Sequence, residues 1–309
     1  MRANRSLFGI VLGALAVTLF AASLPMTRVA VSALDPWFVT TARGAGAGMV
    51  AADLLIAIRR PIPWRDLPRL IVIALCLVVG FPLLMAIAMK TVPSAHGGVI
   101  LSLLPMATAI AAVFLAGERP SPFFWTMSGL GALLVVAFSL RDGGVTPAAG
   151  DLTLFAAVAI CGIGYALSGS LARRMPGWEV ISWAVVISLP VLLIAAIALR
   201  PDAPASVPWP SWASLLYLAL VSQYFGFFLW NSALAAGGVA RIGQVQLLQP
   251  FATLAIAALM LGEAIDLRMI VFATAVVAVV ALGMKARVGT ERTSAVPPPV
   301  GAPAEPERS

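Results

Sequence analysis

The sequence predicts an all-α membrane protein with ten transmembrane helices, arranged as two inverted five-helix repeats around a central cavity. Composition gives the class: the 309-residue chain is 61% hydrophobic and 11% charged, with a mean hydropathy of +1.00. Soluble domains carry about 25% charged residues. An internal duplication gives the arrangement, because residues 95–118 and 240–263 align without a gap, 145 positions apart, and nine of 24 positions are identical.

Ten apolar stretches are long enough to cross the hydrocarbon layer, which takes roughly 20 helical residues. Helices are expected because an open sheet edge or a loop in lipid would leave backbone groups unpaired. The segments 59–66, 142–147 and 201–211 separate stretches and contain the Pro and Gly residues that end helices. The expected spans are 7–24, 35–57, 68–89, 95–116, 122–140, 152–172, 178–199, 212–234, 240–261 and 267–284.

The basic residues of the loops predict the topology. With the N-terminus in the cytoplasm, twelve Lys and Arg residues lie on the cytoplasmic side and five on the opposite side. Cytoplasmic loops carry the excess of basic residues, so both termini are expected in the cytoplasm. We expect repeats at 7–140 and 152–284, and a disordered cytoplasmic tail at 285–309, which is rich in Pro and Ala. Five helices are an odd number, so the second repeat enters the membrane upside down, as in many transporters.

Each copy of the duplicated segment contains a proline in its middle, Pro105 and Pro250. A proline removes one helix hydrogen bond and frees the carbonyl four residues earlier. That carbonyl needs a partner at membrane depth, so each kink is expected to face protein, water or ligand. The prolines therefore either line a cavity or make a purely structural bend.

Polar side chains flank the proline of the second copy at two positions where the first copy has leucines. The spacing i, i+3, i+7 places Gln246, Gln249 and Thr253 on one helix face. The matching positions of the first copy are Leu101, Leu104 and Thr108. A cavity with amides on one wall and leucines on the other suits an amphipathic solute. Alternatively, the glutamines hydrogen-bond across helices and only hold the bundle together.

These residues, together with Asp35-Pro36-Trp37 and Arg43 in the second span, resemble the drug/metabolite transporter superfamily, in particular its EamA-like family. The resemblance covers about 7 to 285. It implies ten helices in two inverted repeats and transport of a solute across a bacterial plasma (inner) membrane. The Trp-Gly pair that this family has near the end of its first helix is missing, since residues 20–25 are FAASLP.

Four further residues are candidates for solute binding. Gln223 and Tyr224 lie in the span 212–234, and Tyr165 lies in the span 152–172. Their amide and aromatic groups suit contacts with a planar or cationic group, although each is also an ordinary helix-packing residue. Arg43 is the one basic residue well inside a span. It either meets an anionic group in a wet cavity or extends outward to structural carbonyls.

Other ionisable residues lie at helix ends. His96 is expected as a capping or solvated residue, and Glu118 and Glu263 are expected to accept hydrogen bonds from the N-terminus of the next helix.

The predicted function is secondary transport, with export of small amphipathic metabolites or drugs by alternating access. The alternatives are a flippase for a lipid-linked carrier and a non-transporting membrane sensor. An enzyme is not expected, because the spans hold no cluster of metal ligands and no nucleophile with a nearby base. We expect no metal, no cofactor and no nucleic-acid partner. The expected partners are a small-molecule solute and the lipid bilayer, and the chain is expected to act as a monomer or a homodimer.

Overall fold

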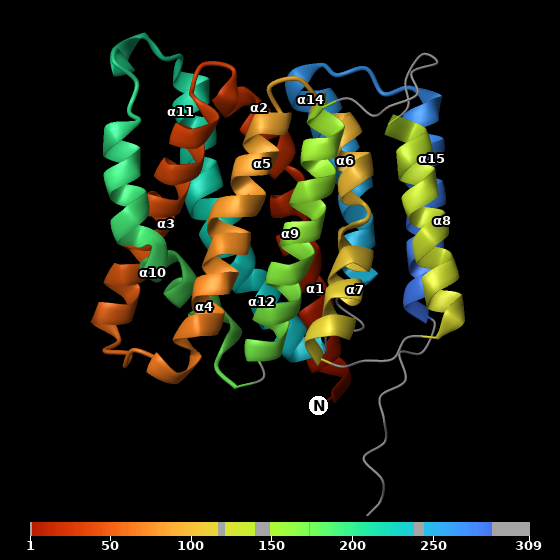
Figure 1. Ribbon diagram of the computed structural model, residues 1–309, viewed down its shortest axis with the longest axis horizontal. Helices are drawn as coiled ribbons and strands as arrows, with labels where there is room; N and C mark the ends of the chain where they lie inside the picture. Colours follow the sequence, from red (N-terminus) through yellow and green to blue (C-terminus); the bar gives the residue numbers. More distant parts are fainter. Residues whose placement is uncertain (1, 117–120, 140–148, 173, 238–243, 286–309) are drawn as a thin grey trace, which may run out of the picture.

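The computed structural model describes residues 2–116, 121–139, 149–172, 174–237 and 244–285. Over these residues the regular secondary structure is helical, and the helices form a bundle in which they run roughly parallel and antiparallel to one another (Figure 1). Glu118 and the predicted tail beyond residue 285 lie outside the described residues.

Every span expected from the sequence contains helix. The first half comprises α1 Arg2–Ala21, α2 Ser23–Val31, α3 Pro36–Ala57, η1 Trp64–Asp66, α4 Leu67–Ile73, η2 Ala74–Gly80, α5 Phe81–Ala88, α6 Ser94–Leu101, α7 Leu104–Ala116 and α8 Pro122–Ser139. The second half comprises α9 Ala149–Leu171, α10 Gly177–Ala198, η3 Pro204–Ser206, α11 Trp209–Leu216, η4 Tyr217–Phe225, α12 Gly226–Gly237, η5 Gln244–Leu248, α14 Gln249–Leu261 and α15 Leu267–Lys285.

The protein is an all-helical membrane protein. Six helical segments of the described chain are long and apolar enough to cross a bilayer: Phe8–Val31, Trp64–Ala88, Ser94–Leu115, Ala149–Leu171, Gly177–Ala198 and Trp209–Ala233. Three apolar helices are shorter: Trp125–Phe138, Val245–Leu261 and Leu267–Gly283. The outer surface is apolar as well, since Leu259, Phe114 and Val191 are each more than 70% exposed. Such a surface is expected where lipid replaces water.

The two prolines of the duplicated segment start new helices instead of bending continuous ones. α6 ends at Leu101, two residues follow, and α7 then begins at Leu104-Pro105. In the second copy the narrow 3-10 segment η5 ends at Leu248, and α14 begins at Gln249-Pro250. Proline fits the first turn of a helix, where its missing N–H has no partner within the helix. The expectation of a kink within one helix is therefore corrected to a break with a restart.

The third helical span of each half contains a wider, π-helical segment. η2 covers Ala74–Gly80 and η4 covers Tyr217–Phe225, so the two overlap when one sequence is shifted by 145 positions. The chain rises through α4 and α5 from the end of the bundle where α1 starts, and it descends through α11 and α12 (Figure 1). Exposed tryptophans precede both segments, Trp64 and Trp209, and they are also 145 positions apart.

Small residues let helices of the two halves approach closely. A Cβ atom at Gly98 of α6 would lie 2.9 Å from the Thr253 methyl group of α14. A Cβ atom at Gly48 of α3 would lie 3.0 Å from the carbonyl oxygen of Val185 in α10. Close contacts between small residues are a usual means of helix association in membranes, where the hydrophobic effect does not drive it. The bundle is therefore packed tightly on both sides of the site described next.

Candidate functional site

A cavity lies where the broken helices and the π-helical segments meet. Its volume is about 30 Å³, counted as the space that the centre of a water molecule can occupy. This is room for about two water molecules. A solute larger than a few water molecules does not fit in this volume. Its lining residues are Phe20, Ser23, Leu24, Arg43, Leu77, Phe81, Met85, Leu101, Leu104, Tyr165, Ser222, Gln223, Phe227 and Gln249.

Three pairs of lining residues stand 145 positions apart in the chain. They are Phe20 with Tyr165, Leu77 with Ser222, and Leu104 with Gln249. In each pair the first half supplies an apolar side chain and the second half a hydroxyl or an amide. At these paired positions the cavity is apolar in the first half and hydrogen-bonding in the second, and Ser23 and Arg43 add polar groups from the first half.

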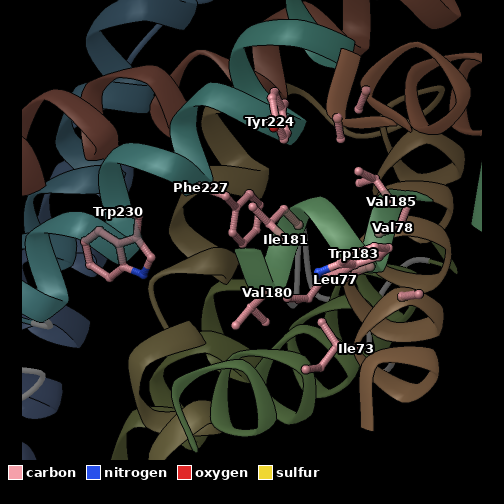
Figure 2. Close-up of a cluster of buried hydrophobic side chains, with 14 of the residues drawn as sticks. Ile73, Leu77, Val78, Val180, Ile181, Trp183, Val185, Tyr224, Phe227 and Trp230 are labelled. Carbon is pink, nitrogen blue, oxygen red and sulfur yellow. The ribbon is translucent and has the colours of Figure 1, made fainter. Parts of the chain in front are cut away.

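Aromatic rings join the two sides. The ring of Phe227 lies 5.2 Å from that of Phe20 and 5.9 Å from that of Tyr165, with edge-to-face geometry in both cases. Trp230, one turn further along α12, lies 6.3 Å from Phe20. Figure 2 shows Phe227 and Trp230 among the buried residues of this cluster. Such pairs hold rings in fixed positions, so this part of the cavity wall is preformed.

Arg43 is the charged group of the cavity. Its side chain is 3% exposed, and its Nη2 atom lies 3.4 Å from Ser222 Oγ. The Ser222 hydroxyl also lies 2.7 Å from the Ser23 hydroxyl. Within the described residues, Arg43 Nε has no hydrogen-bond partner and no carboxylate forms an ion pair with the guanidinium. The side chain therefore does not extend outward to carbonyl groups, which was one of the two expectations.

Gln223 is fully buried beside Arg43. Its Nε2 atom donates a 3.2 Å hydrogen bond to the carbonyl oxygen of Leu77, and its Oε1 atom has no partner among the described residues. The donor lies in η4 and the acceptor in η2, so this bond connects the two π-helical segments. In a π-helix the carbonyl of residue i pairs with residue i+5, which changes the direction of side chains and carbonyls relative to an α-helix.

Two of the predicted amide-face residues lie off the cavity. Gln246 is buried within η5, and its side chain is not among the lining residues. Thr253 donates a 3.1 Å hydrogen bond to the carbonyl oxygen of Ala21, so it connects α14 to α1. The spacing i, i+3, i+7 gives one face only in a continuous α-helix, and the chain changes from 3-10 to α geometry at Gln249.

Other predicted residues support the site without lining it. The Tyr224 hydroxyl lies 3.0 Å from Ser182 Oγ of α10, away from the cavity. Thr108 donates to the carbonyl oxygen of Leu104 at 2.9 Å. Pro105 and Pro250 are buried directly after Leu104 and Gln249. They fix the first turn of the helix that each of these lining residues begins.

The sequence analysis did not name the cavity residues of the first and third spans. Phe20, Ser23 and Leu24 come from the first span, and Leu77 comes from η2. A usable signal was present, because the 145-residue shift relates Phe20 to Tyr165 and Leu77 to Ser222.

Glu263 holds together the end of the bundle opposite the start of α1. It accepts hydrogen bonds from Ser94 N at 3.0 Å, Ser94 Oγ at 2.6 Å and Ala95 N at 2.8 Å. Arg28 Nε lies 3.5 Å from the same carboxylate. Glu263 thus caps α6, the copy of its own helix in the other half. The expectation that it caps the next helix is wrong.

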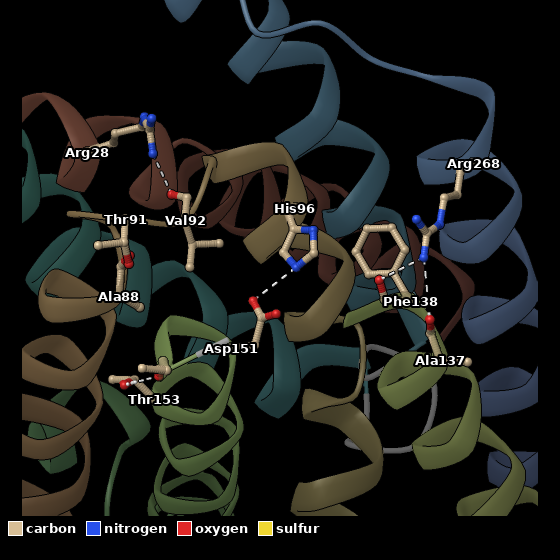
Figure 3. Close-up of polar contacts among 11 residues, drawn as sticks. Arg28, Ala88, Thr91, Val92, His96, Ala137, Phe138, Asp151, Thr153 and Arg268 are labelled. Carbon is tan, nitrogen blue, oxygen red and sulfur yellow. Dashed lines mark hydrogen bonds and ion pairs between the residues drawn. The ribbon is translucent and has the colours of Figure 1, made fainter. Parts of the chain in front are cut away.

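His96 is buried and not a solvated residue at a helix end. Its Nε2 atom lies 3.0 Å from Asp151 Oδ1 of α9, and its ring stacks on Phe138 with 4.4 Å between the centroids. Arg268 bonds to the carbonyl oxygen of Phe138 and lies over its ring (Figure 3). The expectation failed because it treated the first turn of α6 as a bundle surface, whereas α8, α9 and α14 cover it.

Comparisons with known proteins agree with the fold. Residues 7–140 and 148–284 both match the EamA-like transporter family. The chain belongs to the EamA-like transporter family. This confirms the resemblance found in the sequence and places the chain in the drug/metabolite transporter superfamily.

Individual relatives span nearly the whole chain. The chain is 44% identical over 279 residues to "Uncharacterized transporter YdeK" of Bacillus subtilis, covering 90% of this chain and 97% of that protein. It is 24% identical to "Probable terminal-alkyne amino-acid exporter" of Streptantibioticus cattleyicolor, covering 85% of this chain and 88% of that protein. A solved crystal structure has the same fold, with a TM-score of 0.61 and 20% identity over 90% of this chain and 98% of the other.

The EamA-family chain is a membrane transporter and not an enzyme. Its substrate is a small molecule. Within the described residues, no group of three His, Cys, Asp or Glu side chains is placed to hold a metal ion.

Proposed function

We propose that this transporter exports small amphipathic solutes by alternating access between two inverted halves. The observation that carries the proposal is the chemistry of the cavity. Leu77, Leu104 and Phe20 supply an apolar wall, and their counterparts in the second half supply hydroxyl and amide groups. A solute with one apolar and one hydrogen-bonding part satisfies both walls at once, whereas a uniformly polar or apolar solute leaves one wall mismatched.

Three features support two inverted five-helix halves, extending over 7–140 and 152–284. The duplicated segments each restart a helix at a Pro residue, at Leu104 and at Gln249. The two π-helical segments lie at corresponding positions, and the helices that contain them run in opposite directions (Figure 1). Lining residues from both halves face one cavity. Inverted repeats of this kind surround the substrate site of many transporters.

The same arrangement fits a multi-pass protein of a bacterial plasma membrane, with ten crossings and both termini in the cytoplasm. The loop-charge difference of twelve to five supports this orientation. The ends of the bundle that hold Trp64 and Trp209 then lie at opposite interfaces, where exposed tryptophans are common in membrane proteins. Relatives from Bacillus subtilis and Streptantibioticus cattleyicolor support a bacterial setting.

The name of the relative from Streptantibioticus cattleyicolor adds a candidate solute class. That protein is named as a probable exporter of an amino acid with a terminal alkyne, a small molecule with polar and apolar parts. We therefore include amphipathic amino acids among the solutes to be tested for this chain.

Counterflow in proteoliposomes tests the proposal. The purified protein is reconstituted, the vesicles are loaded with one unlabelled probe, and uptake of the same labelled probe is followed. The panel contains L-leucine, L-phenylalanine, their carboxamides and benzyl alcohol as amphipathic probes, with sucrose as a polar control. We expect saturable counterflow for at least one amphipathic probe and none for sucrose, because alternating access exchanges solute across the membrane.

Two results would contradict the proposal. Absence of counterflow for every amphipathic probe would exclude this class of substrate. Scrambling of a fluorescent lipid-linked sugar by the same vesicles, without movement of any small probe, would favour the flippase alternative. Protein-free vesicles prepared in parallel supply the background in both cases.

A further inference from the structure

We propose that Arg43, with Ser222 and Gln223, forms a binding subsite for a carboxylate group of the solute. The inference deepens the proposed function and rests on it, because it places one end of an amphipathic solute in the cavity. It also makes the solute class more specific: a small carboxylate whose remaining part is apolar.

The first argument concerns the charge of Arg43. A guanidinium group remains charged at physiological pH, and an uncompensated charge inside a membrane protein is strongly unfavourable. Yet the side chain is 3% exposed, and its one hydrogen-bond contact with the described residues is the 3.4 Å approach of Nη2 to Ser222 Oγ. A neutral hydroxyl at that distance satisfies little of the hydrogen-bonding capacity of five N–H donors. The cavity therefore holds a positive charge that no acidic side chain of the described residues balances.

The acids of the described chain do not supply the missing negative charge. Asp35 caps α3, and Asp53 is exposed ten residues further along the same helix. Asp151, Glu179 and Glu263 have partners near the ends of the bundle. None of these residues lines the cavity. A ligand carboxylate is consequently the group that completes the charge balance at this site.

The second argument concerns geometry. Arg43 Nε has no partner, and the guanidinium lines the cavity, so a planar carboxylate can accept two parallel hydrogen bonds from it. The paired hydroxyls of Ser23 and Ser222 lie beside it and can each rotate to donate a further bond. These groups come from α2, α3 and η4. A bound carboxylate would therefore contact all three elements at once.

Gln223 gives the site a preference for a hydrogen-bond donor of the solute next to the carboxylate. Its Nε2 atom is occupied by the carbonyl of Leu77, which leaves Oε1 as a buried acceptor without a partner. Oε1 fits an N–H or O–H group of the solute close to the carboxylate. The apolar remainder then lies against Phe20, Leu101 and Leu104 on the opposite side.

A purely structural role for Arg43 makes a different prediction for stability. If the guanidinium mainly held α3 to η4, its removal would lower the thermal stability of the ligand-free protein. If it awaits a ligand, removal of an uncompensated buried charge leaves that stability unchanged or raises it. Two measurements on Arg43 variants therefore distinguish a structural role from a ligand-binding role: the thermal stability of the ligand-free protein, and the selectivity of transport between acid and amide solutes.

The experiment compares matched acid and amide probes on the full-length chain. Wild type, Arg43→Gln, Arg43→Lys and the exposed control Arg69→Gln are reconstituted, and competition with counterflow is measured for L-phenylalanine against L-phenylalaninamide and for 3-phenylpropionate against 3-phenylpropionamide. We expect wild type and Arg69→Gln to prefer the acid of at least one pair by about tenfold or more, because a charge-assisted bidentate contact is lost in the amide. Arg43→Gln should remove the preference, and Arg43→Lys should keep part of it.

Two outcomes would overturn the subsite. Wild type that transports an amide as well as its acid shows that the cavity does not read a carboxylate, although transport itself then stands. An Arg43→Gln protein that keeps the acid preference, or melts several degrees below wild type without ligand, assigns Arg43 to the scaffold. If wild type moves none of the amphipathic probes, the proposed function fails, and the subsite fails with it.

Discussion

The two halves of this transporter share a backbone plan and differ in the chemistry of the side chains they present to the cavity. Both restart a helix at a Pro residue and both contain a π-helical segment. At the positions that line the cavity, the first half has Phe20, Leu77 and Leu104, and the second half has a phenol, a hydroxyl and an amide. Duplication thus supplied the geometry, and divergence of a few side chains supplied the two-sided cavity.

Arg43 departs from this division. It belongs to the first half, whose three paired lining positions are apolar, and the position 145 residues later is Ser188, which bonds to carbonyls of its own helix. The charge therefore has no counterpart in the second half. A single charged group in a cavity of this size gives the site one preferred orientation for a solute.

Replacement of a glutamine of the second half by the leucine found at the corresponding position of the first half should give the largest effect on transport. Gln249→Leu installs the residue of the first half, and Gln246→Leu does the same at a buried position off the cavity. We expect Gln249→Leu to raise the apparent KM about tenfold, because a polar group of the solute then loses its partner in a buried site.

Gln246→Leu should change the KM by less than about threefold. Counterflow kinetics of the two variants, at matched expression, test the comparison. Equal losses in both would mean that the glutamines act through helix association, and the division of the cavity into two walls would be withdrawn.

A smaller effect is expected when Tyr165 of the second half is replaced by phenylalanine, the residue type of its first-half counterpart Phe20. Tyr165→Phe removes one hydroxyl from the cavity, and Tyr224→Phe removes one that faces Ser182 instead. One neutral hydrogen bond contributes about 1 kcal/mol, so Tyr165→Phe should raise the KM by about fivefold.

Tyr224→Phe should leave the KM near wild type and lower the thermal midpoint instead, because a buried Ser182 hydroxyl loses its partner. The measurement is the pair of KM and melting temperature for each variant. The comparison fails if Tyr224→Phe is the variant that impairs transport.

The smallest effect on transport is expected at the end of the bundle, where the halves contact each other through polar groups. Glu263→Ala removes the acceptor of three hydrogen bonds from Ser94 and Ala95. Loss of a helix cap costs about 0.5–2 kcal/mol, so the melting temperature should fall by a few degrees.

The KM should stay within about twofold of wild type, since the carboxylate lies away from the cavity lining. The exposed control Asp53→Ala should change neither quantity. A large rise in KM for Glu263→Ala would show that this end of the bundle also controls access of the solute.

Composition and hydrophobic patterning were sufficient for the helical membrane class, and the family followed from the resemblance of a few motifs to those of known transporters. Patterning was less informative where the helix changes pitch. The α-helical spacing placed Gln246 beside Gln249, but a 3-10 segment ends between them and only Gln249 lines the cavity. The break itself was signalled by Pro250, although not its type, because Pro permits both a kink and a restart.

Contacts between distant segments were the second limit. The partner of His96 is Asp151, 55 positions later, and the partner of Glu263 is Ser94, 169 positions earlier. Neither pairing follows from local sequence, since each depends on which helices become neighbours in the bundle. Arg43 shows the opposite case: the sequence left its surroundings open, and the structure places its side chain buried at the cavity.

The matching π-helical segments also carry information about ancestry. A wide turn of this kind is uncommon in proteins and does not arise from a general tendency of apolar helices. Here it occurs once in each half, over Ala74–Gly80 and over Tyr217–Phe225, at places related by the same shift that aligns Pro105 with Pro250. Copying of a single unit that already contained the widened turn accounts for its presence at corresponding places in both halves.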